Sequence, residues 1–373
     1  MPFQSKPEWL VPQLPETATA LPAPFYTDPD AFAAERQCVF ASSWQLVAHA
    51  SELSGTGDHV VTEVAGLPLI IVHGEDGELR AFHNVCRHRA GPLATCNGKG
   101  ARALRCHYHA WTYTLEGQLR SAPEMGEAKD FNVSQIALPQ AQVGIWHGLV
   151  FVAVGSAPPF AELLAGIDSR LGTTHIDDYQ FHNRVSYEIE ANWKTYVDNF
   201  LEGYHLPHIH PALNRLLDYR SYTTETSAWH SLQSSPMENS ENFYGSGEAL
   251  YYFIYPNTML NILPDRLQTN RVTSLSANRC RVDFDFYYPP SADTEELKRR
   301  SQDQAFSDEI QIEDIQICES VQKGLASGSY EAGRLNPKRE SGVHHFHELL
   351  RTAWREREGW ELEPSERIRL EIP

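Results

Sequence analysis

Two closely spaced cysteine–histidine pairs constrain this chain more than any other feature of its sequence. Cys86-x-His88 is followed, after 17 residues, by Cys106-x-x-His109. The neighbouring runs "RAFHN" and "WTY" are β-rich, which predicts that each pair lies in a loop joining two strands. Two such loops can hold four ligands around one small centre, and thiolates with imidazoles suit zinc or an iron–sulfur cluster. The four side chains are therefore predicted to bind a cofactor.

The order of the ligands favours a cluster over zinc. A zinc finger usually joins a cysteine pair to a histidine pair carried on a helix. Here each half supplies one cysteine and one histidine from β surroundings. In a Rieske [2Fe–2S] centre two cysteines hold one iron and two histidines hold the other, which fits this pattern. Zinc is the alternative.

The composition is typical of a globular protein, and the net charge disfavours some classes of binding partner. Its 373 residues are long enough for two domains, and no apolar run approaches the ~20 residues of a membrane span. The 31 basic and 49 acidic residues give a net charge of -18, which disfavours nucleic acid and anionic membranes. The start of the chain lacks the features of a signal peptide, so we expect a cytoplasmic location. Six irregularly spaced cysteines do not resemble a disulfide framework.

The secondary structure predicted from the residue pattern changes twice along the chain, which indicates an α+β fold in two domains. Residues 1–42 are expected to form an arm and a helix, capped by Asp28, that pack on the larger domain. Residues 43–155 carry short β-branched runs and glycine-rich turns, such as "GEDG", typical of a small all-β domain. Residues 156–373 contain both helical and strand patterns. Helices are expected over 160–171, from 192, over 294–325 and over 343–358, and strands over 182–191, 251–263, 266–277 and 279–289.

A second group of candidate metal ligands lies in "NWKTYVDNFLEGYHLPHIHPAL". On a helix that begins near Asn192, the side chains of Asp198, Glu202 and His205 fall at i, i+4 and i+7 and share one face. Two carboxylates and an imidazole on one stripe are costly to bury without a cation. This stretch therefore predicts a metal site.

The chain is expected to turn directly after this helix face. Pro207 disfavours a helical conformation at Leu206, so a turn there can return His210 to the side of His205. Two histidines and one carboxylate form the facial triad of non-haem Fe(II) oxygenases, which leaves coordination positions open for dioxygen and substrate. The carboxylate can come from this stripe or from elsewhere in the chain.

Both constellations resemble those of the Rieske non-haem iron oxygenases. The family's cluster motifs read C-P-H-R-G and C-P-Y-H-G-W, and this chain reads C-R-H-R-A and C-H-Y-H-A-W. All four ligands are present, whereas the prolines are replaced by Arg87 and His107 and the glycines by Ala90 and Ala110.

The resemblance is to the oxygenase type of cluster. The respiratory Rieske type carries two further cysteines that form a disulfide. In this chain Tyr108 stands at the second of those positions, and Cys96 lies too far along to be the first. Cys96 is therefore expected to be a reduced thiol.

The second constellation resembles the α (oxygenase) subunits of the same family, in which N-W-K precedes an acidic residue, two residues, His, four residues and His. The match of Glu202-x2-His205-x4-His210 implies His205 and His210 as iron ligands. It implies that Glu202 links this iron to a cluster histidine on the adjacent subunit. Asp198, on the same predicted helix face, is a further catalytic candidate.

The third ligand is implied by a motif near the C-terminus. "IEDIQICESVQKGL" resembles the acidic helix that precedes a V-Q-R-G-L motif in one branch of the family. The resemblance implies Asp314 as the ligand, with Glu313 and Glu319 as alternatives.

The resemblance covers nearly the whole chain and implies a terminal oxygenase component. It implies a Rieske domain followed by a catalytic domain of the helix-grip, START-like kind, with a curved antiparallel sheet and helices. Electrons from NAD(P)H would arrive through a flavin and iron–sulfur reductase, with or without a ferredoxin, pass to the cluster, and then reach Fe(II) where dioxygen meets the substrate. Because the two centres of one chain lie far apart in such enzymes, a head-to-tail homotrimer is expected.

The substrate implied is a quaternary ammonium compound. Chain length, Glu202 and the C-terminal motif look most like oxygenases of carnitine, choline or betaines, with C–N cleavage or N-demethylation. Such a cation binds among aromatic rings. The runs "YYFIYPNTML", "FDFYYP" and "ENFYGSG" could supply them, or could fill a core. The alternative is an aromatic ring-hydroxylating mono- or dioxygenase, and outside this class an electron-transfer protein or a zinc scaffold.

Overall fold

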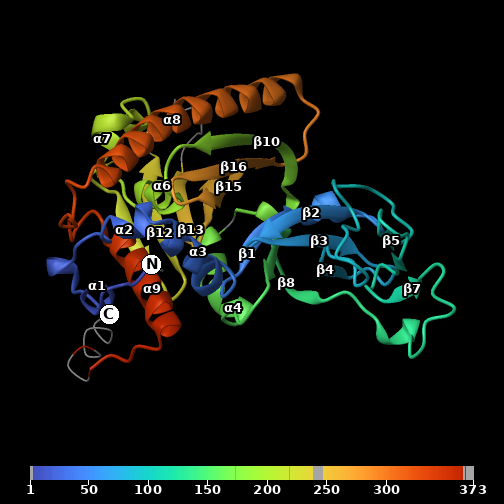
Figure 1. The fold of residues 1–373 in the computed structure, drawn as a ribbon. Helices are drawn as coiled ribbons and strands as arrows, with labels where there is room; N and C mark the ends of the chain where they lie inside the picture. Colours follow the sequence, from blue (N-terminus) through green and yellow to red (C-terminus); the bar gives the residue numbers. More distant parts are fainter. Residues whose placement is uncertain (1–2, 173, 218, 238–246, 364–365, 367–373) are drawn as a thin grey trace. The chain divides into compact units, whose positions relative to one another are not determined.

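A computed structural model of the chain describes residues 3–172, 174–217, 219–237, 247–363 and 366 (Figure 1). The chain forms two compact units. One unit is Phe40–Phe160, and the other joins Met1–Val39 to Ala161–Pro373. No helix among the described residues is both long and apolar enough to cross a membrane.

The unit over Phe40–Phe160 is built from antiparallel sheets. Its larger sheet has six strands in the order β1-β9-β8-β4-β3-β2. These strands are β1 (Gln45–His49), β2 (His59–Val64), β3 (Leu67–His73), β4 (Leu79–His83), β8 (Gln140–Trp146) and β9 (Leu149–Ala153). The smaller sheet consists of β5 (Leu104–Arg105), β6 (Thr112–Tyr113) and β7 (Leu119–Ser121). The predicted hairpin at "GEDG" joins β3 to β4.

Strand β3 separates two apolar cores in this unit. Ile70 and Val72 belong to one core, and Leu69 and Ile71 belong to the other. Successive side chains of a strand point to opposite faces, so a continuous apolar run such as "LPLIIV" identifies a strand that is covered on both sides. The core around Ile70 also contains the cysteines of both cysteine–histidine pairs.

The other unit contains a seven-stranded antiparallel sheet in the order β10-β16-β15-β14-β13-β12-β11. Its strands are β10 (Gln180–Ile189), β11 (Thr223–Thr226), β12 (His230–Met237), β13 (Gly247–Ile254), β14 (Thr258–Leu263), β15 (Arg266–Ser276) and β16 (Arg279–Tyr288). The main helices are α6 (Trp193–Phe200), α8 (Thr294–Ala326) and α9 (Ser341–Glu358). Figure 1 shows α8 running along β10, β16 and β15. The predicted α+β class is confirmed.

Two predicted elements differ from those in the structure, and two strands were missed. The run 251–263 is a hairpin rather than one strand, because Pro256 has no N–H for the ladder and the chain turns there between β13 and β14. The helix expected over 160–171 is divided into α4 (Phe160–Leu163) and α5 (Ile167–Leu171), with Gly166 at a φ of 88° between them. Strands β11 and β12 were not predicted, because buried polar residues in β12 interrupt its apolar pattern.

The N-terminal segment belongs to the same unit as the large sheet. It contains α1 (Pro7–Leu10), α2 (Pro24–Thr27) and α3 (Pro29–Glu35), and the carboxylate of Asp28 caps α3 as predicted. Glu35 and Lys194 of α6 form an ion pair at 2.8 Å, and both side chains are fully buried. This pair anchors α3 to the helix that begins the second constellation.

Helix α8 buries a polar face. It spans 33 residues, and five of the seven buried ones are polar: Arg300, Asp303, Ser307, Gln311 and Gln322. A surface helix normally buries an apolar stripe. A long helix that turns polar side chains toward the sheet instead indicates a functional site beneath it.

Candidate metal centres and substrate cavity

The segment after α6 does not continue as the predicted helix. Helix α6 ends at Phe200, so Asp198 and Glu202 do not share a helical face with His205. A second helix of a single turn, α7 (Leu206–Ile209), follows with His205 as its N-cap residue.

Pro207 was expected to disfavour helix at Leu206, but Leu206 is helical, because proline fits the first turn of a helix, where its missing N–H has no intrahelical acceptor. The expected approach of the two histidines nevertheless occurs. This one-turn helix separates them in sequence and holds the ring centroids of His205 and His210 5.0 Å apart. The turn of the chain is therefore helical, and the histidines are neighbours.

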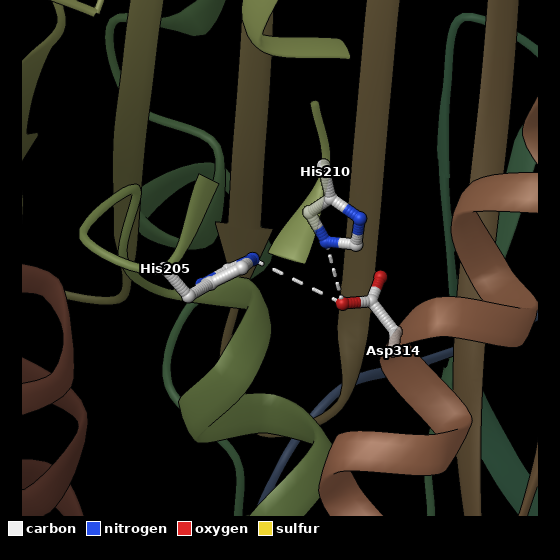
Figure 2. Close-up of side chains that lie close together, drawn as sticks. All are labelled: His205, His210 and Asp314. Atoms are coloured by element: carbon white, nitrogen blue, oxygen red, sulfur yellow. Dashed lines mark hydrogen bonds and ion pairs between the residues drawn. The ribbon is translucent and has the colours of Figure 1, made fainter. Parts of the chain in front are cut away.

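His205, His210 and Asp314 converge on one point, as Figure 2 shows. One ligand atom from each lies within 4.8 Å of the others. Asp314 Oδ1 lies 2.9 Å from His210 Nε2 and 3.9 Å from His205 Nε2. The histidines come from the segment around α7, and the carboxylate comes from α8. Two imidazoles and one carboxylate form the donor set of a non-haem iron site.

A carboxylate holds the second ring nitrogen of each histidine. Glu202 Oε1 lies 2.6 Å from His205 Nδ1, and Glu313 Oε2 lies 2.7 Å from His210 Nδ1. Such a partner keeps the proton on Nδ1 and leaves the lone pair of Nε2 for a metal. Glu313, one alternative for the third ligand, thus contacts His210 on the side of the ring away from Asp314. Glu319, the other alternative, accepts a hydrogen bond from the backbone N–H of Glu190.

The charges of this site suit a bound cation. Burial opposes the charged form of His210, but hydrogen bonds and charges of Asp314 and Glu313 outweigh it and raise the pKa of His210. The carboxylates therefore attract positive charge to the point where the three ligand atoms meet. The donor set and its electrostatics both fit a mononuclear iron.

Sequence reasoning did not find Asn199. Its side-chain amide donates to Asp314 Oδ1 at 2.6 Å and so joins α6 to α8. An asparagine in the last turn of a helix has no distinctive pattern, because most such residues only interact with water or with the helix end. The contact depends on an α8 residue 115 positions away in the sequence.

Asp198 belongs to a different network. Its carboxylate accepts hydrogen bonds from the Tyr26 hydroxyl at 2.6 Å and from Nε2 of the fully buried His347 at 2.9 Å. Burial, followed by the nearby charge of Asp198, raises the pKa of Tyr26. Asp198 thus connects α6 to α2 and α9 and lies outside the converging group, contrary to the expected shared face.

The two cysteine–histidine loops have the same backbone structure. The carbonyl of Cys86 accepts from the N–H of Ala90 at 3.0 Å, and the carbonyl of Cys106 accepts from the N–H of Ala110 at 3.1 Å. Both alanines have a φ of 59°. This left-handed region favours glycine, which is the residue that the family motifs carry at both positions.

The four side chains of these loops differ in exposure. Cys86 and Cys106 are each 3% exposed, and His88 and His109 are half-buried with ring centroids 4.6 Å apart. His88 Nδ1 is buried and has no hydrogen-bond partner among the described residues. Burial, with the nearby His88 and Arg89, lowers the pKa of His109 and favours the neutral imidazole that binds metals. Inner thiols, outer imidazoles and an unsatisfied ring nitrogen fit a Rieske cluster.

Tyr113 lies against the first cysteine. Its hydroxyl oxygen is 3.3 Å from Cys86 Sγ and accepts from the N–H of Arg87 at 2.9 Å. Burial and the hydrogen bond to Cys86 raise the pKa of Tyr113, so the hydroxyl keeps its proton at neutral pH. With Cys86 as a thiolate, Tyr113 is the donor to its sulfur.

A cavity of about 130 Å³ opens beside the three converging side chains. Six aromatic residues, which we call the aromatic lining, contribute to its wall: Tyr196, Phe200, Tyr222, Tyr251, Phe284 and Phe306. Tyr251 and Phe284 come from two of the predicted aromatic runs, whereas residues 241–246 of the third run lie outside the described residues. Other members of these runs, such as Tyr252 and Tyr287, are buried in the core.

Comparison with known families identifies the class of protein. Residues 43–136 match the Rieske [2Fe-2S] domain, and residues 176–356 match the ring hydroxylating alpha subunit (catalytic domain). The chain belongs to the Rieske non-haem iron oxygenases, as an α (oxygenase) subunit. Enzymes of this class are oxidoreductases that use a Rieske [2Fe–2S] cluster and a mononuclear iron. The alternatives of a zinc scaffold and an electron-transfer protein are therefore wrong.

The more similar relatives belong to the branch that the sequence predicted. Choline monooxygenase (chloroplastic) of Arabidopsis thaliana is 35% identical over 359 residues, 91% of this chain and 84% of that protein. The carnitine monooxygenase oxygenase subunit of Escherichia coli (strain K12) is 31% identical over 92% of this chain and 97% of that protein. The quaternary ammonium Rieske monooxygenase CntA, solved with L-carnitine, matches with a TM-score of 0.81 and 29% identity over 91% of this chain and 96% of that one.

Proposed function

We propose that this chain is the terminal oxygenase component of an enzyme system that uses dioxygen and NAD(P)H-derived electrons to hydroxylate a small quaternary ammonium compound, with C–N cleavage or N-demethylation. The observation that carries the proposal is the convergence of His205, His210 and Asp314 at the edge of a cavity with an aromatic lining. Aromatic faces attract a quaternary ammonium group. Relatives that act on choline and carnitine support the same substrate class.

We assign the two cofactors to the two constellations. In this proposal residues 43–155 form the cluster domain, in which Cys86, His88, Cys106 and His109 hold the [2Fe–2S] cluster. Residues 156–373, with residues 1–42 packed on them, form the catalytic domain, in which His205, His210 and Asp314 hold Fe(II). When bound, the cluster supplies electrons one at a time and the iron supplies the position at which dioxygen is activated.

The protein side chains orient the ligands and shape the cavity. Glu202 and Glu313 keep the Nδ1 protons of the two histidines in place, so both Nε2 atoms face the metal position. Asn199 holds Asp314 from the opposite helix. The aromatic lining excludes water and binds the cation beside the open coordination positions.

Glu202 is our candidate for the residue that connects the iron site with a partner subunit. Glu202 and His205 line both the substrate cavity and a second cavity of about 640 Å³. We propose that a cluster histidine of a neighbouring subunit approaches Glu202 from the side of the second cavity, in a head-to-tail homotrimer. Inter-subunit electron transfer has been described for a quaternary ammonium Rieske monooxygenase of this fold. A flavin and iron–sulfur reductase, with or without a ferredoxin, would reduce the cluster.

The proposal is tested with purified oxygenase, reconstituted with iron and sulfide, and a surrogate reductase with NADH. Choline, carnitine and glycine betaine are compared with simple aromatic acids, and released formaldehyde or aldehyde is scored against diols. Turnover of an ammonium compound is expected. Coupled turnover of aromatic acids alone would replace this proposal by a ring-hydroxylating activity.

A pair of histidine variants tests the assignment of the iron ligands. His205→Ala is expected to abolish turnover and remove the mononuclear iron while the [2Fe–2S] spectrum remains. His208→Ala changes an exposed histidine three residues away and is expected to leave activity unchanged. Equal activity in the two variants would contradict the assignment.

A further inference from the structure

Two side-chain amides that line the substrate cavity each have one buried polar atom without a hydrogen-bond partner among the described residues. These atoms are Nε2 of Gln311 and Oδ1 of Asn261. Gln311 is 1% exposed and Asn261 is 6% exposed. Buried polar groups are nearly always hydrogen-bonded in folded proteins, so a bare donor and a bare acceptor in a binding cavity point to groups that the ligand satisfies.

The other half of each amide is already engaged. Gln311 Oε1 accepts from the hydroxyl of Tyr196 at 2.8 Å, and Asn261 Nδ2 donates to Asn270 Oδ1 at 3.4 Å. These contacts orient the amides and leave the amide nitrogen of Gln311 and the carbonyl oxygen of Asn261 without a partner among the described residues. Gln311 precedes Asp314 by three residues on α8, a rise of about 4.5 Å along the helix. The two polar atoms therefore belong to the same cavity as the proposed iron.

The cavity does not offer an uncompensated cation. Arg266 is the single Lys or Arg among its described lining residues, and its Nη1 lies 2.5 Å from Oδ1 of the fully buried Asp303. A carboxylate that entered the cavity would lose its hydration without gaining a counter-charge from a lysine or arginine side chain. A hydroxyl can instead accept from the N–H of Gln311 and donate to the carbonyl of Asn261.

We propose that Gln311 and Asn261 determine specificity by binding an uncharged hydroxyl at the end of the substrate opposite the ammonium group, so that the enzyme selects ammonium alcohols over ammonium carboxylates. This inference rests on the proposed function. It deepens that function by assigning the polar end of the substrate to two side chains. A carboxylate has no proton for Asn261 Oδ1 and places a second oxygen lone pair against it, which is a repulsive contact.

Equilibrium binding to the anaerobic, iron-loaded oxygenase provides the test, with calorimetry as the readout. Choline and glycine betaine form a matched pair, because they differ only in a hydroxymethyl or a carboxylate group. Tetramethylammonium has neither group, so its affinity measures the contribution of the aromatic lining alone. Choline is expected to bind at least about 100-fold more tightly than glycine betaine, since polar sites reject ligands that leave their groups unpaired. Glycine betaine binding equal to or tighter than that of choline would overturn the inference.

Two variants connect the preference with the proposed residues. Gln311→Met and Asn261→Leu are each expected to weaken choline binding about tenfold, the worth of one hydrogen bond. Both should leave the affinity for tetramethylammonium unchanged, which also shows that the variant is folded. Gln316→Met, on an exposed position of α8, is the control and is expected to behave as the wild type.

The outcomes separate this inference from the function on which it rests. If none of the three ammonium compounds binds while an aromatic acid does, the proposed function fails and this inference fails with it. If choline and tetramethylammonium lose affinity equally in Gln311→Met, the ammonium site stands but the role of Gln311 is wrong. The wild-type comparison of choline with glycine betaine does not depend on any variant.

Discussion

Asn199 Nδ2 donates a hydrogen bond to Asp314 Oδ1 across 2.6 Å, and so connects the last turn of α6 with the middle of α8. The same carboxylate oxygen lies 2.9 Å from His210 Nε2. The amide thus holds Asp314 at the point where both histidines converge. This relationship makes the position of the third proposed ligand depend on two helices that are far apart in the sequence.

Removing this amide should weaken iron binding. Asn199→Ala leaves Asp314 without its donor, and loss of a group that orients a metal ligand typically lowers metal affinity 10–100-fold. Mononuclear iron content after dialysis, measured by mass spectrometry, is expected to fall, while the cluster signal in electron paramagnetic resonance is unchanged. Asn183→Ala, at an exposed position of β10, is the control. Full iron retention in Asn199→Ala would show that Asp314 needs no such support.

Glu313 is expected to act through His210. Glu313→Ala should lower iron affinity by a similar 10–100-fold factor, because the imidazole of His210 loses the partner of its Nδ1. Glu313→Gln keeps an acceptor for Nδ1–H and should retain more iron than the alanine variant. Glu319→Ala removes another carboxylate of α8 and should retain the wild-type content. Loss of iron in Glu319→Ala alone would place the third ligand at Glu319.

Tyr113 should raise the reduction potential of the cluster. Its hydroxyl lies 3.3 Å from Cys86 Sγ, and hydrogen bonds to sulfur stabilise the more negative, reduced state. Tyr113→Phe is therefore expected to lower the midpoint potential in a redox titration followed by circular dichroism. Tyr108→Phe, in a side chain that is 57% exposed, provides the comparison. An unchanged potential in Tyr113→Phe would mean that this hydroxyl serves Arg87 N–H alone.

Replacing the alanines with positive φ in the two cysteine–histidine loops by glycine should stabilise the fold. Ala90 and Ala110 both have a φ of 59°, a conformation that is ~1 kcal/mol or more unfavourable for a residue with a Cβ. Ala110→Gly is expected to raise the unfolding free energy by up to ~1 kcal/mol, less the added entropy of glycine in the unfolded chain. Thermal bleaching of the cluster measures the effect. Ala153→Gly, in the buried strand β9, should destabilise instead.

Acid should destabilise the fold through His345 of α9. Burial lowers the pKa of this imidazole to about 4, whereas an unfolded histidine titrates near 6.5. Between these values the unfolded chain binds more protons, so stability rises with pH from about 4 to about 6.5 and is lost as pH falls, by up to ~3 kcal/mol. His345→Gln should flatten urea-unfolding free energies over this range. His208→Gln, at an exposed histidine, should leave the slope unchanged.

Local sequence patterns were sufficient to predict much of the fold. The apolar run of β3, the turn at "GEDG" and the cap at Asp28 all act over a few residues, and each was predicted. The two predicted elements that are divided in the structure also have local causes, namely Pro256 and Gly166. Strand β12 was missed because its buried residues are mostly polar, and polar burial depends on partners that only the folded sheet supplies.

The sequence by itself determined the chemistry of this protein. The types and spacing of the proposed ligands at Cys86/His88, Cys106/His109 and His205/His210 are properties of short loops, because the chain between the members of each pair is too short to separate them. These short-range patterns also identified the oxygenase class.

Only the tertiary structure decided which acidic and amide side chains support that chemistry. Asp198 and Asn199 are adjacent in sequence, yet one contacts Tyr26 and His347 while the other contacts Asp314. Residues that neighbour each other on a helix point in different directions, and their partners lie on segments more than 100 positions away. Long-range packing, which no local pattern encodes, therefore separated the network of Asp198 from the candidate iron site.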